Sequence, residues 1–217
     1  MLLAKQPFVF QAVSEIVPES PAQARAVPAR RAHSRLPQVL DQAARVFARR
    51  GFAAASMRDI AQPIRMQPGS LYYYFPTKED LLVAVYREGT RRLSGAVDAA
   101  TAAGRDPWRR LEAACVAHLE ALLDRTDYSQ VVIRVRPGDA PSVAAQLAQL
   151  RNLYEQRFVR LVAELPLAPS VRRDDLRLML MGALNWSQEW YREDGRLEPG
   201  QIARRFVGLL RGGLDRP

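Results

Sequence analysis

The 217-residue sequence predicts an all-α protein, in which three short N-terminal helices precede a larger helical bundle. From Pro37 onward, apolar residues recur at the spacing of an amphipathic helix almost throughout. Capping residues, prolines and glycines separate these apolar stretches from one another. No segment alternates apolar and polar residues as a half-buried strand would. These observations favour a chain built only from helices.

Capping signals mark where the N-terminal helices begin and end. The first predicted helix ends at Gly51, because glycine readily takes the left-handed backbone conformation that follows a helix. Ser56 with Asp59, and Thr77 with Asp80, are capping-box-like pairs three residues apart. We therefore expect the second helix to begin after Ser56 and a longer fourth helix to begin after Thr77.

The third helix is predicted to begin at Gln67 and Pro68 and to end before Pro76. With the second helix it forms a helix-turn-helix unit, whose last helix is short enough to enter the major groove of DNA. Residues 72–74 are three successive tyrosines. They cannot all be buried, because successive helical residues point about 100° apart, so we expect at least one hydroxyl to face outward. The alternative is that the tyrosines form part of the core.

Residues 39–88 resemble the DNA-binding domain of TetR-family bacterial transcriptional regulators. The resemblance is carried by the motifs FARRGF at 47–52, SMRDIA at 56–61 and PGSLYYYFPTKEDLL at 68–82. It implies a repressor that binds a palindromic operator in double-stranded DNA. It also implies which residues approach DNA: Arg58, Gln67, Pro68, Gly69, Ser70, Tyr72, Tyr73 and Lys78.

The turn between the second and third helices departs from the family pattern. Family members usually carry alanine-glycine-valine here, whereas this chain has Ile64, Arg65 and Met66 after Pro63. A residue other than glycine costs about 1 kcal/mol at positive φ. We also expect Pro63 to shorten the second helix or distort its end. An alternative is that Arg65 adds a contact with a DNA phosphate.

The chain is predicted to divide into a flexible basic arm at 1–35, the helix-turn-helix domain at 36–84 and a ligand-binding and dimerisation domain at 85–217. The formal net charge of +9 favours a polyanionic partner, either nucleic acid or an anionic membrane surface. The arm is either a tail without function or a basic segment that contacts phosphates or the minor groove.

The last two helices are the expected homodimer interface. Residues 176–186 are apolar on more than one face, so this helix is expected to be buried on two sides. Phe206, Leu209 and Leu210 of the final helix would complete a four-helix interface between two copies. The alternative is a central helix buried within a monomer.

The middle helices are expected to hold a small-molecule effector. Aromatic and polar side chains there are candidate pocket residues, namely Trp108, His118, Tyr128, Tyr154, Phe158 and Trp186. His118 could instead be a core histidine. Segments 185–192 and 195–197 look like the tail of family members that sense acyl-CoA thioesters, which implies an acyl-CoA or another lipophilic effector. Arg134, Arg136 and Arg151 would then meet its phosphates, or else remain solvated.

Other functions have less support in the sequence. Cys115 and His118 lie three residues apart, but no third group that would orient a catalytic pair is visible, so we expect no enzymatic activity. With two histidines and one cysteine, no metal site or cofactor is expected. No signal peptide or transmembrane run is expected either, which favours a cytoplasmic protein. The remaining alternative is a helical module that binds membrane surfaces or proteins without reading DNA sequence.

Overall fold

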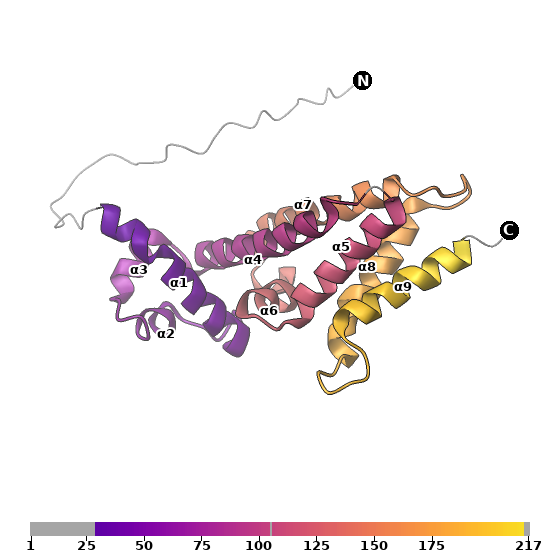
Figure 1. Cartoon of the computed structure of the whole chain (residues 1–217). Coiled ribbons are helices and arrows are strands. Elements are labelled where there is room, and N and C mark those ends of the chain that lie inside the picture. The colour runs from indigo at the N-terminus through magenta and orange to yellow at the C-terminus, as the bar shows by residue number, and fades with distance from the viewer. Residues whose placement is uncertain (1–28, 105, 215–217) are drawn as a thin grey trace, which may run out of the picture. The chain divides into compact units, whose positions relative to one another are not determined.

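The computed structural model describes residues 29–104 and 106–214, and every regular element within them is helical (Figure 1). The all-α prediction is therefore confirmed. In chain order the elements are α1 (Ala29–Arg50), α2 (Met57–Ala61), α3 (Pro68–Tyr74), α4 (Lys78–Thr101), α5 (Pro107–Leu123), α6 (Asp127–Arg134), η1 (Pro137–Asp139), η2 (Pro141–Val143), α7 (Ala144–Ala163), α8 (Arg173–Trp190) and α9 (Pro199–Leu214). No helix within the described ranges is long and apolar enough to span a bilayer.

The first helix begins earlier than the sequence predicts. Residues 1–28 of the predicted arm lie outside the described residues, but residues 29–35 belong to α1, and Pro37 lies within that helix. Placing all of residues 1–35 in a flexible arm was therefore wrong. Proline removes one backbone donor and causes a local clash, but helical turns can continue on either side of it. Arg35, assigned to the arm, instead donates a hydrogen bond to the Ile64 carbonyl in the turn.

The predicted caps are present. The Ser56 hydroxyl accepts a hydrogen bond from the Asp59 amide, and the Asp59 carboxylate accepts one from the Ser56 amide. Thr77 and Asp80 form the same reciprocal pair at the start of α4. Gly51 follows α1 with a φ of 77°. The two capping pairs, Ser56 with Asp59 and Thr77 with Asp80, satisfy backbone donors that the first turn of a helix leaves without partners.

The turn between α2 and α3 is a Schellman motif with an arginine in the usual glycine position. The Arg65 amide donates to the Gln62 carbonyl, and the Met66 amide donates to the Ala61 carbonyl. Arg65 has a φ of 51°, in the left-handed region that favours glycine. Helix α2 ends at Ala61, two residues before Pro63. A local pattern of backbone hydrogen bonds thus sets the angle between α2 and α3.

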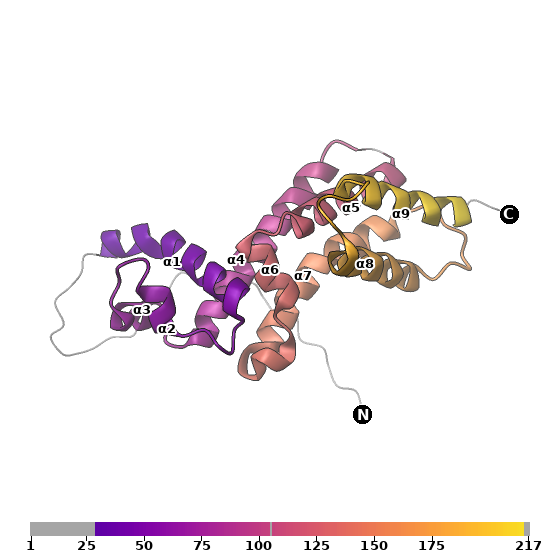
Figure 2. The same ribbon diagram turned by 90° about the horizontal axis from the view of Figure 1, so that it is seen from below.

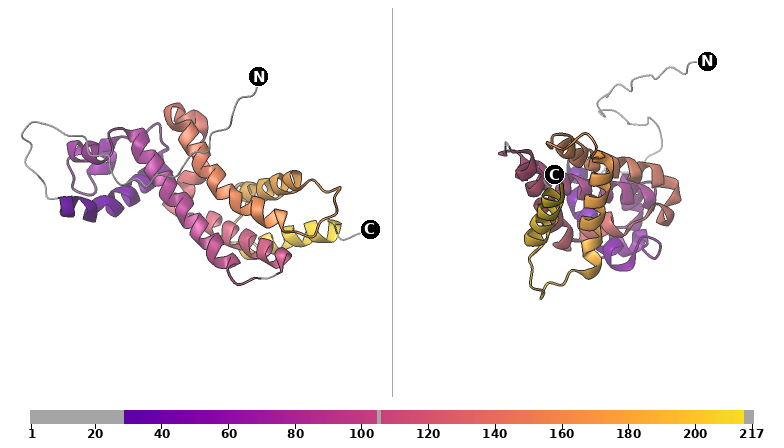
Figure 3. Two further views of the ribbon diagram at one scale, coloured as in Figure 1. Left: turned by 90° about the horizontal axis from the view of Figure 1, so that it is seen from above. Right: turned by 90° about the vertical axis from the view of Figure 1, so that its right-hand side faces the viewer.

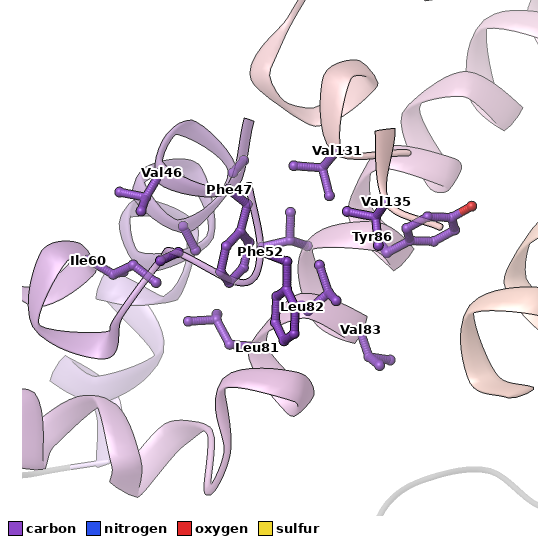
Figure 4. Packing of buried hydrophobic residues seen from close by; sticks show 14 of the residues in the cluster. Val46, Phe47, Phe52, Ile60, Leu81, Leu82, Val83, Tyr86, Val131 and Val135 are labelled. Carbon is purple, nitrogen blue, oxygen red and sulfur yellow. The ribbon is translucent and has the colours of Figure 1, made fainter. Parts of the chain in front are cut away.

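The short helices pack on a first apolar cluster that continues into the C-terminal part (Figure 4). Phe47 of α1 and the adjoining Phe52 contact each other with their ring centroids 5.6 Å apart. Leu81 and Leu82 of α4 are fully buried in the same cluster. The cluster then extends through α6 and into the first turns of α7. The helix-turn-helix unit therefore shares its core with elements more than forty residues further along the chain.

A second apolar cluster holds α5, α7, α8 and α9 together. Figures 2 and 3 show α5, α8 and α9 lying side by side, in agreement with the contacts between these helices. Leu111, Cys115 and Leu119 of α5 are completely buried in this cluster. These three residues thus lie on the inward face of α5.

Arg65→Gly is expected to raise the free energy of unfolding by about 1 kcal/mol, because glycine adopts positive φ without steric cost. Arg65→Ala is the control, since it removes the side chain but keeps Cβ. Urea unfolding of the two variants and the parent chain measures the difference. A gain of equal size in both variants would show that the arginine side chain, and not its backbone conformation, is destabilising.

Candidate functional site

Helix α3 presents most of its surface to solvent. Leu71 is its only buried residue, and it anchors the helix on the first cluster. Tyr72 and Tyr73 are 51% and 83% exposed, whereas Tyr74 is half-buried against the edge of the Tyr73 ring. The expectation that the tyrosines cannot all be buried is confirmed. Two aromatic side chains on an exposed two-turn helix are suited to contact with another molecule.

The start of α3 is open on its outer side. Gln67, Gly69 and Ser70 are exposed, and Pro68 is half-buried as the first residue of the helix. A Cβ atom added at Gly69 would meet nothing within 4 Å, and Gly69 has no positive φ. Nothing within the chain therefore requires glycine at this position. A glycine without an internal reason is compatible with the close approach of a partner's backbone.

An open depression with a volume of about 680 Å³ lies where α2 meets the α2–α3 turn and the start of α3. Two arginines, Arg58 and Arg65, line it together with Gln62, Gln67, Met66 and Pro68. Neither arginine has an ion-pair partner within the part of the chain that the structure describes. Exposed guanidinium groups beside amide side chains are the donors that bind phosphate oxygens in nucleic acids.

Lys78 has an internal role that the sequence did not predict. Its ammonium group donates to the carbonyls of Phe52 and Ala55, both at 2.9 Å, and lies 3.4 Å from the Ala53 carbonyl. It also lies 4.4 Å from the centre of the Phe52 ring. These carbonyls take the three donors of the ammonium group. In this structure Lys78 supports the α1–α2 connection, and its predicted contact with DNA remains a prediction.

A cavity of about 330 Å³ lies between α4, α5, α6, α7 and α8. Two of the six predicted pocket residues, His118 and Tyr154, line it. The other lining residues are Tyr86, Thr90, Leu93, Leu122, Val132, Ile133, Val135, Arg136, Arg151, Glu155, Met181, Asn185 and Gln188. Of the arginines considered from the sequence, Arg136 and Arg151 are at the cavity, and Arg134 is not among its lining residues.

Four predicted pocket residues lie elsewhere. Trp108 is buried in the second cluster, and Phe158 packs behind the cavity wall with its ring 5.6 Å from that of His118. Tyr128 belongs to the first cluster, and Trp186 is 66% exposed on α8. These four residues do not line this cavity, because residue type does not reveal which side of a helix faces a cavity. The sequence prediction missed Tyr86 because nothing in its sequence neighbourhood distinguishes it from a core aromatic.

His118 is held in the cavity wall by two hydrogen bonds. Its Nε2 is 3.2 Å from the Asn185 amide oxygen, and its Nδ1 is 2.6 Å from the Tyr154 hydroxyl. Because an amide oxygen only accepts, Nε2 carries the proton, and Nδ1 accepts the hydroxyl hydrogen of Tyr154. Burial lowers the pKa of His118 from 6.5 to about 4, and the bond to Asn185 opposes this shift. The imidazole is therefore neutral near pH 7.

Tyr128 connects α6 with α1 and α4. Its hydroxyl donates to the Asp41 carboxylate at 2.9 Å, and the Arg92 guanidinium lies 4.0 Å from the centre of its ring. Arg134, at the end of α6, donates to the Ala48 carbonyl at 3.4 Å. Because Val132 and Ile133 of the same helix line the cavity, α6 contacts both the cavity and the helix-turn-helix unit.

Acid is expected to destabilise the protein through His118. The unfolded chain binds a proton near pH 6.5 and the folded chain only near pH 4, so the free energy of unfolding falls as pH drops through this window. Between pH 7 and 5 the loss is about 2 kcal/mol, and His118→Gln should lack it. Urea unfolding at both pH values measures the effect. Equal pH dependence of the two proteins would contradict the assignment.

Two family models together match most of the chain. Residues 39–85 match the model described as "Bacterial regulatory proteins, tetR family". Residues 104–214 match "Tetracyclin repressor-like, C-terminal domain". The matched regions coincide with the helix-turn-helix unit and with the helices that follow α4.

Curated relatives and solved structures agree with these matches. The transcriptional repressor KstR2 of Mycolicibacterium smegmatis is 30% identical over 190 residues, covering 83% of this chain and 91% of the relative. AibR, solved in complex with isovaleryl coenzyme A and operator DNA, is 25% identical with a TM-score of 0.68, covering 81% of this chain and 97% of AibR. KstR2 of Mycobacterium tuberculosis, a ketosteroid transcriptional regulator, shares the fold at 21% identity and a TM-score of 0.64, covering 90% of this chain and 98% of that one. This chain therefore belongs to the TetR family of bacterial regulatory proteins and is a DNA-binding transcriptional repressor.

Proposed function

We propose that the protein is a homodimeric repressor that binds a palindromic operator and is released from it by an acyl-CoA or a related lipophilic effector. The observation that carries the proposal is the outer face of α3, where Gln67, Gly69, Ser70, Tyr72 and Tyr73 are exposed beside two arginines without ion-pair partners in the described chain. Such a helix reads base edges in the major groove, while arginine and tyrosine side chains hold phosphates.

The dimer is proposed to form through α8 and α9. The buried face of α8 carries Leu176, Leu180 and Leu184, whereas Met179 and Trp186 of its other face are exposed. On α9, Leu209 is 76% exposed. Large apolar side chains on the outer faces of two adjacent helices favour a four-helix interface with a second copy.

The cavity is the proposed effector site. It combines apolar side chains with two arginines, and Arg136 is exposed while Arg151 is half-buried. An acyl thioester has matching parts, since its hydrocarbon group would occupy the apolar interior and its phosphates would meet the guanidinium groups. The complex of the structural relative AibR with isovaleryl coenzyme A supports this class of ligand.

Helix α6 is the proposed link between effector and DNA. A ligand that contacts Val132 and Ile133 on one side of α6 would change how Tyr128 and Val131 pack on the helix-turn-helix side. Release of DNA requires that the ligand bind better to the conformation that does not bind the operator. We propose that the protein has no enzymatic activity, because the Cys115 thiol lies in the second apolar cluster and burial raises its pKa, which keeps it protonated.

Operator binding should depend on Tyr72 and Gly69. With DNA selected from a random pool, Tyr72→Ala is expected to weaken binding by about 1–2 kcal/mol through loss of a hydrogen bond to phosphate. Gly69→Ala should weaken binding without lowering stability, because the chain has room for the methyl group. Leu153→Ala on α7 is the control. Fluorescence anisotropy measures the affinities, and unchanged binding in both α3 variants would refute the proposed DNA-binding face.

Dimerisation should depend on Trp186. Trp186→Arg places a charge within the proposed interface and is expected to convert the dimer to a monomer with much weaker operator binding. Leu153→Arg, at a similarly exposed leucine of α7, is the matched control and should remain dimeric. Light scattering after size-exclusion chromatography measures the mass. A dimer that persists in Trp186→Arg would place the interface elsewhere.

A further inference from the structure

One residue of the cavity wall carries a polar atom without a hydrogen-bond partner among the described residues. Tyr86 of α4 is 1% exposed, and its hydroxyl oxygen is buried without a hydrogen-bond partner among the described residues. Tyr86 lines the cavity together with Thr90, one helical turn further along α4. In Figure 4 the Tyr86 ring lies beside Val135, and its oxygen points away from the rest of the labelled cluster.

The other buried polar groups of the cavity wall have partners. His118 and Tyr154 bond to each other, and His118 also bonds to Asn185. The Thr90 hydroxyl donates to the backbone carbonyls of Tyr86 and Arg87. Within the described lining of the cavity, Tyr86 is therefore the exception.

An unpartnered buried hydroxyl lowers the stability of the folded protein. Phenylalanine would fill almost the same space without leaving a donor unsatisfied. Because the Tyr86 hydroxyl oxygen has almost no accessible surface in the structure, a ligand group would reach it only as the cavity wall shifts around the ligand. Sites for small ligands use a few such polar groups in an apolar wall to fix orientation and specificity.

We propose that the Tyr86 hydroxyl is a specificity determinant that hydrogen-bonds a neutral ketone or hydroxyl oxygen at the inner end of the effector. This inference rests on the proposed function, in which the anionic end of the effector meets Arg136 and Arg151. Those arginines are more exposed than Tyr86, so the opposite end of the ligand enters the buried part of the cavity. The oxygen is neutral because a buried charge needs a charged partner, and the buried polar groups nearby are hydroxyls and a neutral imidazole.

The test compares two probes that differ by one oxygen atom, octanoyl-CoA and 7-oxooctanoyl-CoA. Calorimetric titration of the full chain is expected to show about tenfold tighter binding of the oxo compound, as one added hydrogen bond to a buried hydroxyl provides. In Tyr86→Phe the two probes should bind within about twofold of each other. Without ligand, the same variant should melt about 2–4 °C higher, because it lacks the unsatisfied hydroxyl.

Tyr128→Phe is the matched control for the melting experiment. Its hydroxyl is bonded to Asp41, so its removal should lower the melting temperature. If the parent chain and Tyr86→Phe show the same ratio of affinities for the two probes, water satisfies Tyr86 and the inference is overturned while the proposed function stands. A lower melting temperature for Tyr86→Phe would also overturn it. If neither probe binds the parent chain, the acyl-CoA effector itself is refuted, and the inference with it.

Discussion

Helix α6 is packed on two sides, and the rest of the molecule depends on how it is held. On one side, Val131 and Val135 belong to the apolar cluster that supports α1–α3. On the other, Val132 and Ile133 form part of the cavity wall. Because protein interiors are densely packed, a helix shared in this way cannot adjust to a ligand on one side without repacking the other. The helix-turn-helix unit and the cavity are thus connected through α6 without a separate joint.

Polar contacts reinforce this arrangement at both ends of α6. Tyr128, near its start, bonds to Asp41 of α1 and packs against Arg92 of α4. Arg134, at its end, reaches the Ala48 carbonyl. Hydrogen bonds are directional, so they define one position of α6 relative to α1 more sharply than apolar contacts do. A change in that position would break specific bonds, which favours two discrete arrangements over a gradual drift.

Two features of the chain lower the stability of the folded protein near the proposed binding surfaces. Arg65 occupies a backbone conformation that favours glycine, and it does so beside the exposed start of α3. Tyr86, in the cavity wall, has a buried hydroxyl without a partner among the described residues. Strain and unsatisfied polar groups concentrate where proteins bind other molecules, because the binding partner recovers part of the cost. By contrast, the capping boxes at the starts of α2 and α4 satisfy the backbone donors there.

The sequence by itself determined the local features of this protein. The capping boxes at Ser56 and Thr77, the positive φ at Arg65 and the outward tyrosines follow from short-range geometry, which a residue and its near neighbours specify. The family resemblance identified the helix-turn-helix unit for the same reason, since its motifs are contiguous. The predicted start of the first helix was nevertheless wrong, because a proline such as Pro37 lowers helix stability locally but does not have to end the helix.

Only the tertiary structure decided which side chains meet across helices. His118 and Tyr154 come together at the cavity, whereas Trp108 and Phe158 are core residues of the same chemical type. Lys78 turns back onto the α1–α2 connection, more than twenty residues away in sequence. Helical periodicity tells which residues share a face, but it contains no information on which other helix that face will meet. Contacts between distant segments depend on how the whole core packs, so the sequence alone did not predict which side chains meet.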